Sequence, residues 1–190
     1  MVSKPKTVGN GAARASGFTM VEMMMTVAIA AIVLTLAVPS FRYVTNSNRI
    51  AAEINGLLGD LQFARAEAIK EGRTVTVCVS SNGTQCTGTT NWQNGWIVFS
   101  DPADIGVVDA NEVILRVQKP FSGTDTFVAN GLSAVTFNRE GYAAPIATGT
   151  LFTLHDSTNT SAWTRCLAFS TIGQVVSERA NISTNVTPCT

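Results

Sequence analysis

The stretch GFTMVEMMMTVAIAAIVLTLAVPSF, from Gly17 to Phe41, most constrains how this chain can fold. From Phe18 to Val38 it has 21 residues and a single charge, that of Glu22. About 20 mainly apolar residues are enough for a helix to cross the hydrocarbon of a bilayer. We therefore expect a membrane-spanning helix here.

Charges are distributed unevenly around this stretch. The first 17 residues contain three cations (Lys4, Lys6 and Arg14) and no acid, whereas the rest of the chain contains ten of the 13 cations and all 13 acids. Because cations flank the cytoplasmic end of membrane helices, the N-terminus is expected in the cytoplasm and the remainder beyond the membrane. The acidic remainder argues against binding driven by nucleic-acid phosphates, which needs clustered Lys and Arg.

A cleaved secretory signal is the alternative interpretation of the apolar stretch. Such a signal has a small-residue cleavage site directly after its core. The residues that follow here, Ala37-Val38-Pro39-Ser40, lack the A-x-A pattern, and Ala28-Ile29-Ala30 lies too far inside the run. The run is also long for a signal core, so a retained anchor is favoured.

Placing the charged side chain of Glu22 near a bilayer costs free energy unless a cation pairs with it. If the chain were cut between Gly17 and Phe18, the new α-amino group of Phe18 would lie one helical turn from Glu22. In a bundle of helices, this amine could pair with the carboxylate of a neighbouring subunit. On charge alone, a Glu22 that lies at the headgroup level without a role remains the alternative.

The basic leader, the hexapeptide Gly17-Phe18-Thr19-Met20-Val21-Glu22 and the apolar run together resemble the processing motif of type IV prepilins. The usual form is G-F-T-L-[IV]-E, from which only Met20 departs. The resemblance implies that prepilin peptidase, a membrane aspartyl peptidase, cuts after Gly17 and methylates the new N-terminus at Phe18. It also implies that Glu22 aligns subunits during assembly.

Helical periodicity continues beyond the apolar run. Apolar residues recur at three- and four-residue steps: Ile50, Ile54, Leu57, Leu58, Leu61, Ala64, Ala68 and Ile69. Gly72 is placed as a C-cap, so we expect a helix from about Phe18 to Glu71. Pro39 interrupts it, because proline lacks an N–H and crowds the carbonyl one turn back. We interpret Pro39 as a hinge, rather than only as a marker of the membrane exit.

After Gly72 the apolar pattern changes to period two and short runs, which predicts strands. The expected strands are 74–80, 96–100, 112–118, 135–137, 151–154, 166–170 and one near 174–178. One helix followed by a run of strands indicates an α+β domain, with the helix packed against antiparallel sheet. The expected organisation is a leader at 1–17, a transmembrane and assembly segment at 18–39, an amphipathic half-helix at 40–72 and a periplasmic β-rich globular domain at 73–190.

The chain has four cysteines, all beyond the apolar run: Cys78, Cys86, Cys166 and Cys189. None forms a C-x-x-C pair, which favours two disulfides in an oxidising compartment, and three pairings are possible. Between Cys78 and Cys86, the sequence Ser81-Asn82-Gly83 suits a three-residue hairpin loop with its glycine at positive φ. A cross-strand Cys78–Cys86 disulfide is consistent with that turn, and a Cys166–Cys189 disulfide would then remain.

The acidic stretch 101–112 matches a twelve-residue calcium loop in part, with Asp101 at position 1 and Glu112 at position 12. Positions 3 and 5, where the loop needs oxygen ligands, are Ala103 and Ile105. We therefore favour a solvated loop between two strands over a calcium site.

No set of residues in the sequence predicts an enzyme. His155, the only histidine, lies beside Asp156 and Ser157, but adjacent residues point apart and do not form a triad. The tryptophans, Trp92, Trp96 and Trp163, are expected in the core or at its rim rather than on a binding face. Neither a metal site nor a cofactor is expected.

Longer segments resemble the GspH/FimT-type minor pilin family. They are LQFARAEAI at 61–69, WQNGWIVFSD at 92–101, EVILR at 112–116 and RCLAFSTIGQVV at 165–176. The resemblance implies a pilin-like fold and a minor type IV pilin that primes or caps the pilus and serves pilus assembly and twitching motility, with adhesion or DNA uptake as further roles. Its implied partners are major and minor pilins, prepilin peptidase and the inner-membrane assembly platform.

The resemblance also implies a location: one pass through the bacterial inner membrane, a C-terminal domain in the periplasm, and incorporation into the fibre. The alternative function is a minor pseudopilin in the tip complex of a type II secretion system. A DNA-binding competence pilin is disfavoured, because DNA-binding members carry G-R-x-R where this chain has Gly173-Gln174-Val175-Val176.

Overall fold

The structure is a computed structural model and describes residues 17–102, 106–144, 146, 150–170, 172–179 and 189. Its elements are one long helix, one short 3-10 helix and a series of strands. They are α1 (Met20–Glu71), β1 (Val75–Val79), η1 (Trp92–Asn94), β2 (Trp96–Ser100), β3 (Ile114–Gln118), β4 (Thr126–Ala129), β5 (Ala134–Phe137), β6 (Ala143–Ala144), β7 (Leu151–His155), β8 (Arg165–Phe169) and β9 (Val175–Arg179). By its internal contacts the chain divides into two compact units between Tyr43 and Val44.

The described part of the first unit is the apolar beginning of α1. Every residue from 17 to 43 is exposed. An 18-residue window of α1 reaches a mean hydropathy of 2.3 with none of the window buried. By length and composition this is a helix able to cross a membrane, as the sequence predicts.

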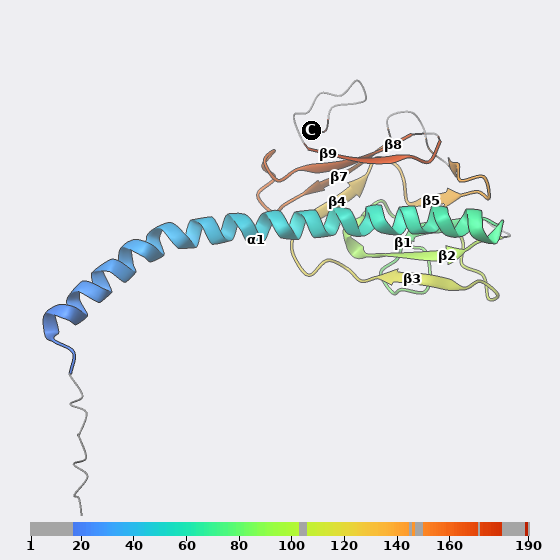
Figure 1. The fold of residues 1–190 in the computed structure, drawn as a ribbon. Coiled ribbons are helices and arrows are strands. Elements are labelled where there is room, and N and C mark those ends of the chain that lie inside the picture. The colour runs from blue at the N-terminus through green and yellow to red at the C-terminus, as the bar shows by residue number, and fades with distance from the viewer. Residues whose placement is uncertain are drawn as a thin grey trace, which may run out of the picture. The chain divides into compact units, whose positions relative to one another are not determined.

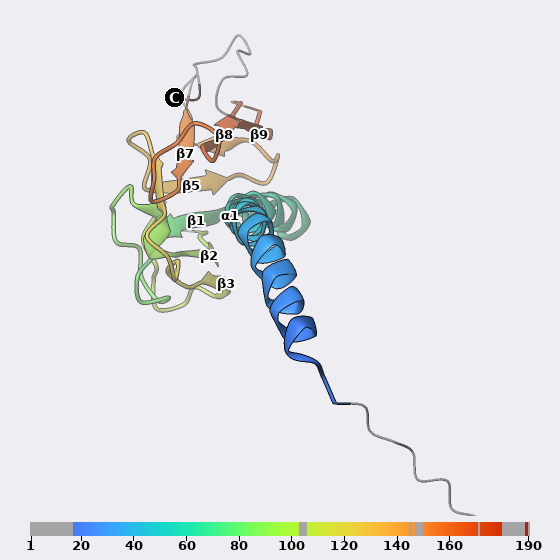
Figure 2. The ribbon, with the colours of Figure 1, turned by 90° about the vertical axis from the view of Figure 1, so that its left-hand side faces the viewer.

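The second unit contains two antiparallel sheets against which the later part of α1 packs. One sheet has the strand order β3-β2-β1-β5-β6, and the other has the order β4-β7-β8-β9. From Val44 onwards α1 runs along both sheets, as Figure 1 shows from the side and Figure 2 nearly end-on. This is the predicted α+β arrangement.

A single stripe of α1 closes the core between the two sheets. Its buried members are Ile50, Ile54, Leu57, Leu61, Ala64 and Ala68. They belong to one cluster with β1 side chains such as Val77 and with Phe152 of β7, whose ring centroid lies 5.0 Å from that of Trp92. The helical spacing predicts this stripe, but Leu58 is only partly buried and Ile69 is 52% exposed, because Ile69 lies a third of a turn beyond the buried Ala68.

The structure contains the Cys78–Cys86 and Cys166–Cys189 disulfides. The predicted hairpin around the first of them is wrong. Strand β1 already pairs with β2 on one side and β5 on the other, so no edge is left for a strand at Cys86. Residues 80–89 form no strand; Asn82 Oδ1 accepts from two backbone N–H groups, and Gly83 has φ of +75°.

Two of the strands were not expected from the sequence. Strands β4 and β6 have four and two residues, too few to show a clear alternation before the flanking turns. The strand expected at 112–118 begins at Ile114, because Glu112 lies in the preceding turn, where its carboxylate accepts from the Asp109 N–H.

We predict that Leu61→Ala lowers the free energy of unfolding by about 2–5 kcal/mol, because it leaves a cavity between the helix and the sheets. Ile69→Ala is the matched control on the same helix and should cost less than about 1 kcal/mol, since Ile69 is half exposed. Both are measured by urea unfolding of the full chain in detergent, followed by tryptophan fluorescence. Equal losses would contradict the assigned buried stripe.

Candidate processing and assembly site

Thr19 caps the beginning of α1. Gly17, Phe18 and Thr19 lie ahead of the helix in irregular backbone. The Glu22 N–H donates to Thr19 Oγ1 at 3.2 Å, and the Met23 N–H donates to the Thr19 carbonyl at 3.1 Å. A threonine followed three residues later by glutamate is the capping-box pattern. The Gly17–Phe18 peptide bond therefore lies ahead of the helix, in exposed irregular backbone.

Glu22 lies in the first turn of α1, where the unpaired N–H groups give the helix its positive end. The helix thus partly compensates the carboxylate. Within the described part of the chain Glu22 is exposed and forms no ion pair. A cation at Phe18, or one from another molecule, would complete its surroundings.

The apolar part of α1 satisfies its hydroxyl groups internally. Thr26 Oγ1 donates to the Met23 carbonyl at 2.9 Å, and Thr35 Oγ1 donates to the Ile32 carbonyl at 2.7 Å. Without water, polar groups must bond within the helix, and this segment meets that requirement. Pro39 lies inside α1, and the helix extends through it. The hinge at Pro39 stays a prediction.

A set of polar contacts joins α1 to the strand ends just after it enters the globular unit. Arg49 Nε lies 2.7 Å from Asp125 Oδ2, and Arg49 Nη2 donates to Asp125 Oδ1 at 2.9 Å. Asn46 Oδ1 accepts a hydrogen bond from Arg49 at 2.7 Å, and Asn46 Nδ2 donates one to Asp156 Oδ2 at 3.4 Å. Asp125 precedes β4 and Asp156 follows β7, so this network fixes the helix to one end of the second sheet.

Glu53 lies one turn further along α1 and belongs to the same network. The pKa of its carboxyl is raised to about 7, first by burial and then by the negative charge and hydrogen bond of Asp125, while the positive charge of Arg49 lowers it in part. One guanidinium therefore serves two carboxyl groups. Sequence analysis missed this network, because residues 76 positions apart meet in it.

A second polar network joins the middle of α1 to the first sheet. Asp60 accepts from the Trp96 indole N–H at 2.9 Å and from Arg116 at 2.9 Å. The Arg116 guanidinium also lies 3.7 Å from the centroid of the Phe63 ring. Trp96 is buried, as is Trp92, whose indole donates to the Leu132 carbonyl at 2.9 Å. These two tryptophans are core residues, as expected.

The acidic stretch 101–112 turns its first carboxylate inward. Asp101 is buried and accepts from Thr76 Oγ1 and from the Gly106 N–H, both at 2.8 Å. Residues 103–105 lie outside the described residues. Among the described residues, no group of three His, Cys, Asp or Glu side chains is placed to hold a metal ion.

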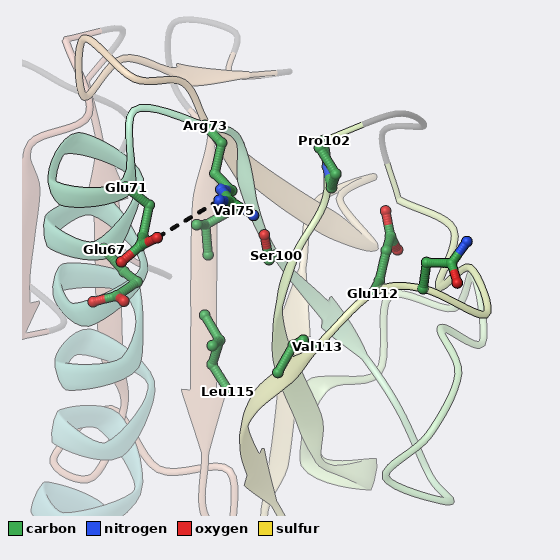
Figure 3. A pocket seen from close by; sticks show the side chains of 10 residues that line it. Glu67, Glu71, Arg73, Val75, Ser100, Pro102, Glu112, Val113 and Leu115 are labelled. Atoms are coloured by element: carbon green, nitrogen blue, oxygen red, sulfur yellow. Dashed lines mark ion pairs between the residues drawn. The ribbon is translucent and has the colours of Figure 1, made fainter.

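A cavity of about 250 Å³ lies between the C-terminal end of α1 and strands β1–β3 (Figure 3). Glu67 and Glu71 line its helical side, and Arg73 lies opposite, 3.8 Å from Glu71. Lys70 pairs with both glutamates, at 3.1 and 3.5 Å. These carboxylates are thus paired within the chain, and no histidine lines the cavity. His155 contacts Thr164 Oγ1 on the neighbouring loop instead.

The turn between β8 and β9, at the place of the G-R-x-R pattern, is held by α1. Arg65 donates to the carbonyls of Ile172 and Gly173 at 3.1 and 3.2 Å. This cation is therefore occupied by backbone oxygens. Gly173 has φ of +75°, and a Cβ there would lie 2.4 Å from the Gly141 carbonyl oxygen, so glycine is required.

Comparisons with known proteins agree with this arrangement. A family model described as type II transport protein GspH matches residues 53–173, and a model of the prokaryotic N-terminal methylation motif matches residues 12–38. No match was found among curated protein sequences.

The described fold is similar to crystal structures of the type IV minor pilin FimU of Pseudomonas aeruginosa. In one crystal form, the identity is 22% and the TM-score 0.55, with 73% of this chain and 92% of that chain covered. In another form, the identity is 22% and the TM-score 0.48, with 68% and 90% covered. The first of these likenesses supports a pilin fold.

We predict that Glu53 makes stability depend on pH. Its pKa is raised from 4.5 to about 7 in the folded chain, so its proton stabilises the fold fully below about pH 4.5, and this contribution is lost as the pH rises through 7. The free energy of unfolding of the native chain, minus that of Glu53→Gln, should fall by about 1 kcal/mol between pH 4.5 and 8, a value reduced by solvent screening at this half-buried group. Urea unfolding of both chains in detergent measures the difference.

The control is Ile69→Ala, a substitution on the same helix that removes no titratable group. The difference between the native chain and this variant should stay constant as the pH rises. A Glu53 difference that rises with pH, or stays constant, would show that the carboxyl is not held in its protonated form.

Proposed function

The chain belongs to the GspH family, and on that premise we propose that it is a minor type IV pilin: a non-enzymatic subunit, held in the bacterial inner membrane until it joins a fibre. The observation that carries this proposal is the beginning of α1. A Gly17–Phe18 bond in exposed irregular backbone is followed by a capped helix with Glu22 in its first turn and an exposed apolar run. This combination serves membrane anchoring and subunit assembly, and it has no role in a soluble enzyme.

Processing prepares the chain for assembly. Prepilin peptidase hydrolyses the Gly17–Phe18 bond, removes the leader at 1–17 and methylates the new amine of Phe18. This amine is a cation next to the helix end, and the Glu22 carboxylate of a neighbouring subunit neutralises it. Because two unpaired charges are costly among apolar helices, the pairing sets the axial position of each subunit.

The remaining segments follow from this order of events. Residues 18–39 cross the membrane and later pack in the fibre, with Pro39 as a hinge, and 40–72 form the amphipathic half-helix. The β-rich domain at 73–190 lies in the periplasm, where both disulfides are stable. The partners are other pilins, prepilin peptidase and the inner-membrane assembly platform.

A second candidate function is a minor pseudopilin of a type II secretion system. The description of the matching family model, a type II transport protein, favours it. Both functions use the same processing and helix assembly. Purification of type IV pili and of the secretion pseudopilus from the same cells, each probed for this chain, tests which fibre contains it.

A role in DNA uptake is not proposed. The turn at 173–176 has glutamine and valine where DNA-binding members carry arginines, and the nearby Arg65 is bonded to backbone carbonyls. One further cation, Arg179, is a weak substitute for a cluster.

We predict that Gly17→Ala leaves the leader attached, because the peptidase must accept the residue before the cut in a confined site. Glu22→Ala should still be cut, but its amount in sheared fibres should fall by at least about tenfold, since an unpaired charge in the bundle costs several kcal/mol. The mass of the membrane-bound chain reports cutting, and immunoblots of the fibre fraction report incorporation.

Glu71→Ala is the control, since it removes a surface carboxylate from the same helix. It should be cut and incorporated normally. If Glu22→Ala is incorporated as well as this control, Glu22 does not align the subunits. If the mature native chain begins at a residue other than Phe18, the processing site is wrong.

A further inference from the structure

A groove of about 280 Å³ runs along the surface of the globular unit, beside α1. Ala52, Glu53 and Gly56 form its helical side. Trp96 of β2 and the segment after β3, with Pro120 and Phe121, form the opposite side. The groove is therefore assembled from three parts of the chain that lie far apart in the sequence.

Glu53 is the one ionisable side chain among the described residues that line this groove. Its Oε2 atom accepts from no N–H or O–H group within the described structure, and its hydrogen bond with Asp125 exists only while the Glu53 carboxyl holds its proton. The nearby guanidinium of Arg49 is engaged by Asp125 through two atoms, at 2.7 and 2.9 Å. When Glu53 ionises, the three groups together carry one uncompensated negative charge. A second cation would complete the set.

The rest of the groove is open and mainly apolar, with Gln118 and Ser122 as its other polar residues. The rings of Trp96 and Phe121 meet edge to face, with their centroids 6.1 Å apart. A Cβ on Gly56 would lie 3.9 Å from Trp96 Cζ2, which is ordinary contact, so alanine would fit. Glycine weakens a helix relative to alanine. Its effect here is to keep the space beside the indole ring free.

We propose that this groove binds the side chain of a lysine or arginine presented by a neighbouring subunit of the fibre. The cationic head pairs with the ionised carboxylate of Glu53, and the apolar stem lies along Trp96 and Phe121. Long cationic side chains bury their methylene groups on apolar surface in this way, and aromatic rings attract the cation. The source of the side chain rests on the proposed function; the chemistry of the groove does not.

Two alternatives fit the structure less well: a calcium ion in this groove, and a cation bound in the cavity of Figure 3. Calcium takes six to eight oxygen ligands, whereas the groove presents one carboxylate, one amide (Gln118) and one hydroxyl (Ser122), and no cluster of metal ligands exists among the described residues. The cavity in Figure 3 has more carboxylates, but Lys70 and Arg73 of the same chain already pair with Glu67 and Glu71. Glu53 has no such cation to itself.

The test uses the full chain in detergent, with ¹⁵N-labelled tryptophan, and N-acetyl-lysine N-methylamide as the probe. At pH 8 we expect a saturable shift of the Trp96 indole N–H signal. N-acetyl-norleucine N-methylamide, which has a similar stem and no charge, should produce none. Glu53→Gln should bind the lysine probe about tenfold more weakly, as expected when a charge-assisted hydrogen bond is lost.

Two further variants separate the groove from general effects on the fold. Ala52→Phe fills the groove from an exposed position without changing its charge, and it should abolish the shift. Glu67→Gln removes a paired carboxylate from the same helix and should leave the shift unchanged. Equal binding of the norleucine probe, unaltered binding to Glu53→Gln, or the same shift with calcium chloride alone would overturn the proposal.

Fibre incorporation of Glu53→Gln then connects the groove to assembly. The variant should be cut normally at Gly17–Phe18 and be recovered in fibres in reduced amount. If the probe does not bind but the native chain is present in fibres, the groove inference fails and the proposed function stands. If the probe binds but the native chain is absent from every fibre, the proposed function fails, and with it the neighbouring subunit as the source of the cation.

Discussion

The two parts of α1 differ in what covers their apolar surface, and this division governs the rest of the chain. Up to Tyr43 the helix is exposed on all sides and apolar on nearly all of them, which is stable only in lipid or among similar helices. From Val44 onwards only one stripe is buried, and it is covered by the chain's own sheets. A single helix therefore contributes both an anchor and the centre of a folded core.

Charges on this helix are placed according to the same division. In the globular unit, Asp60 and Glu67 face cations of the chain and are paired. Glu22 has the positive end of the helix and nothing else within the described residues, and Glu53 shares a guanidinium that Asp125 already engages. In a medium of low polarity a charge needs a partner. Glu22 and Glu53 are consequently the two carboxylates of α1 that need a cation from another molecule.

The sequence predicts the features that depend on neighbours along the chain. The period of 3.6 residues gives the buried stripe from Ile50 to Ala68, and alternation gives the central strands β1 and β2, because both patterns reflect local backbone geometry. The motif at Gly17–Glu22 is likewise local.

What the sequence did not predict depends on pairing between distant segments. The hairpin at Cys86 failed because β1 is a central strand, which only the complete sheet reveals. The Arg49–Asp125 and Asp60–Trp96 contacts join residues 76 and 36 positions apart, and no spacing rule links them. The groove also depends on tertiary structure, since Glu53 and Phe121 line it together only after folding.

The processing motif of such a chain is local and can be common to pili and secretion fibres, so it does not distinguish one neighbouring subunit from another. Discrimination must therefore come from surfaces built by tertiary structure, where a single unmatched carboxylate beside two aromatic rings accepts one kind of side chain and rejects an uncharged one.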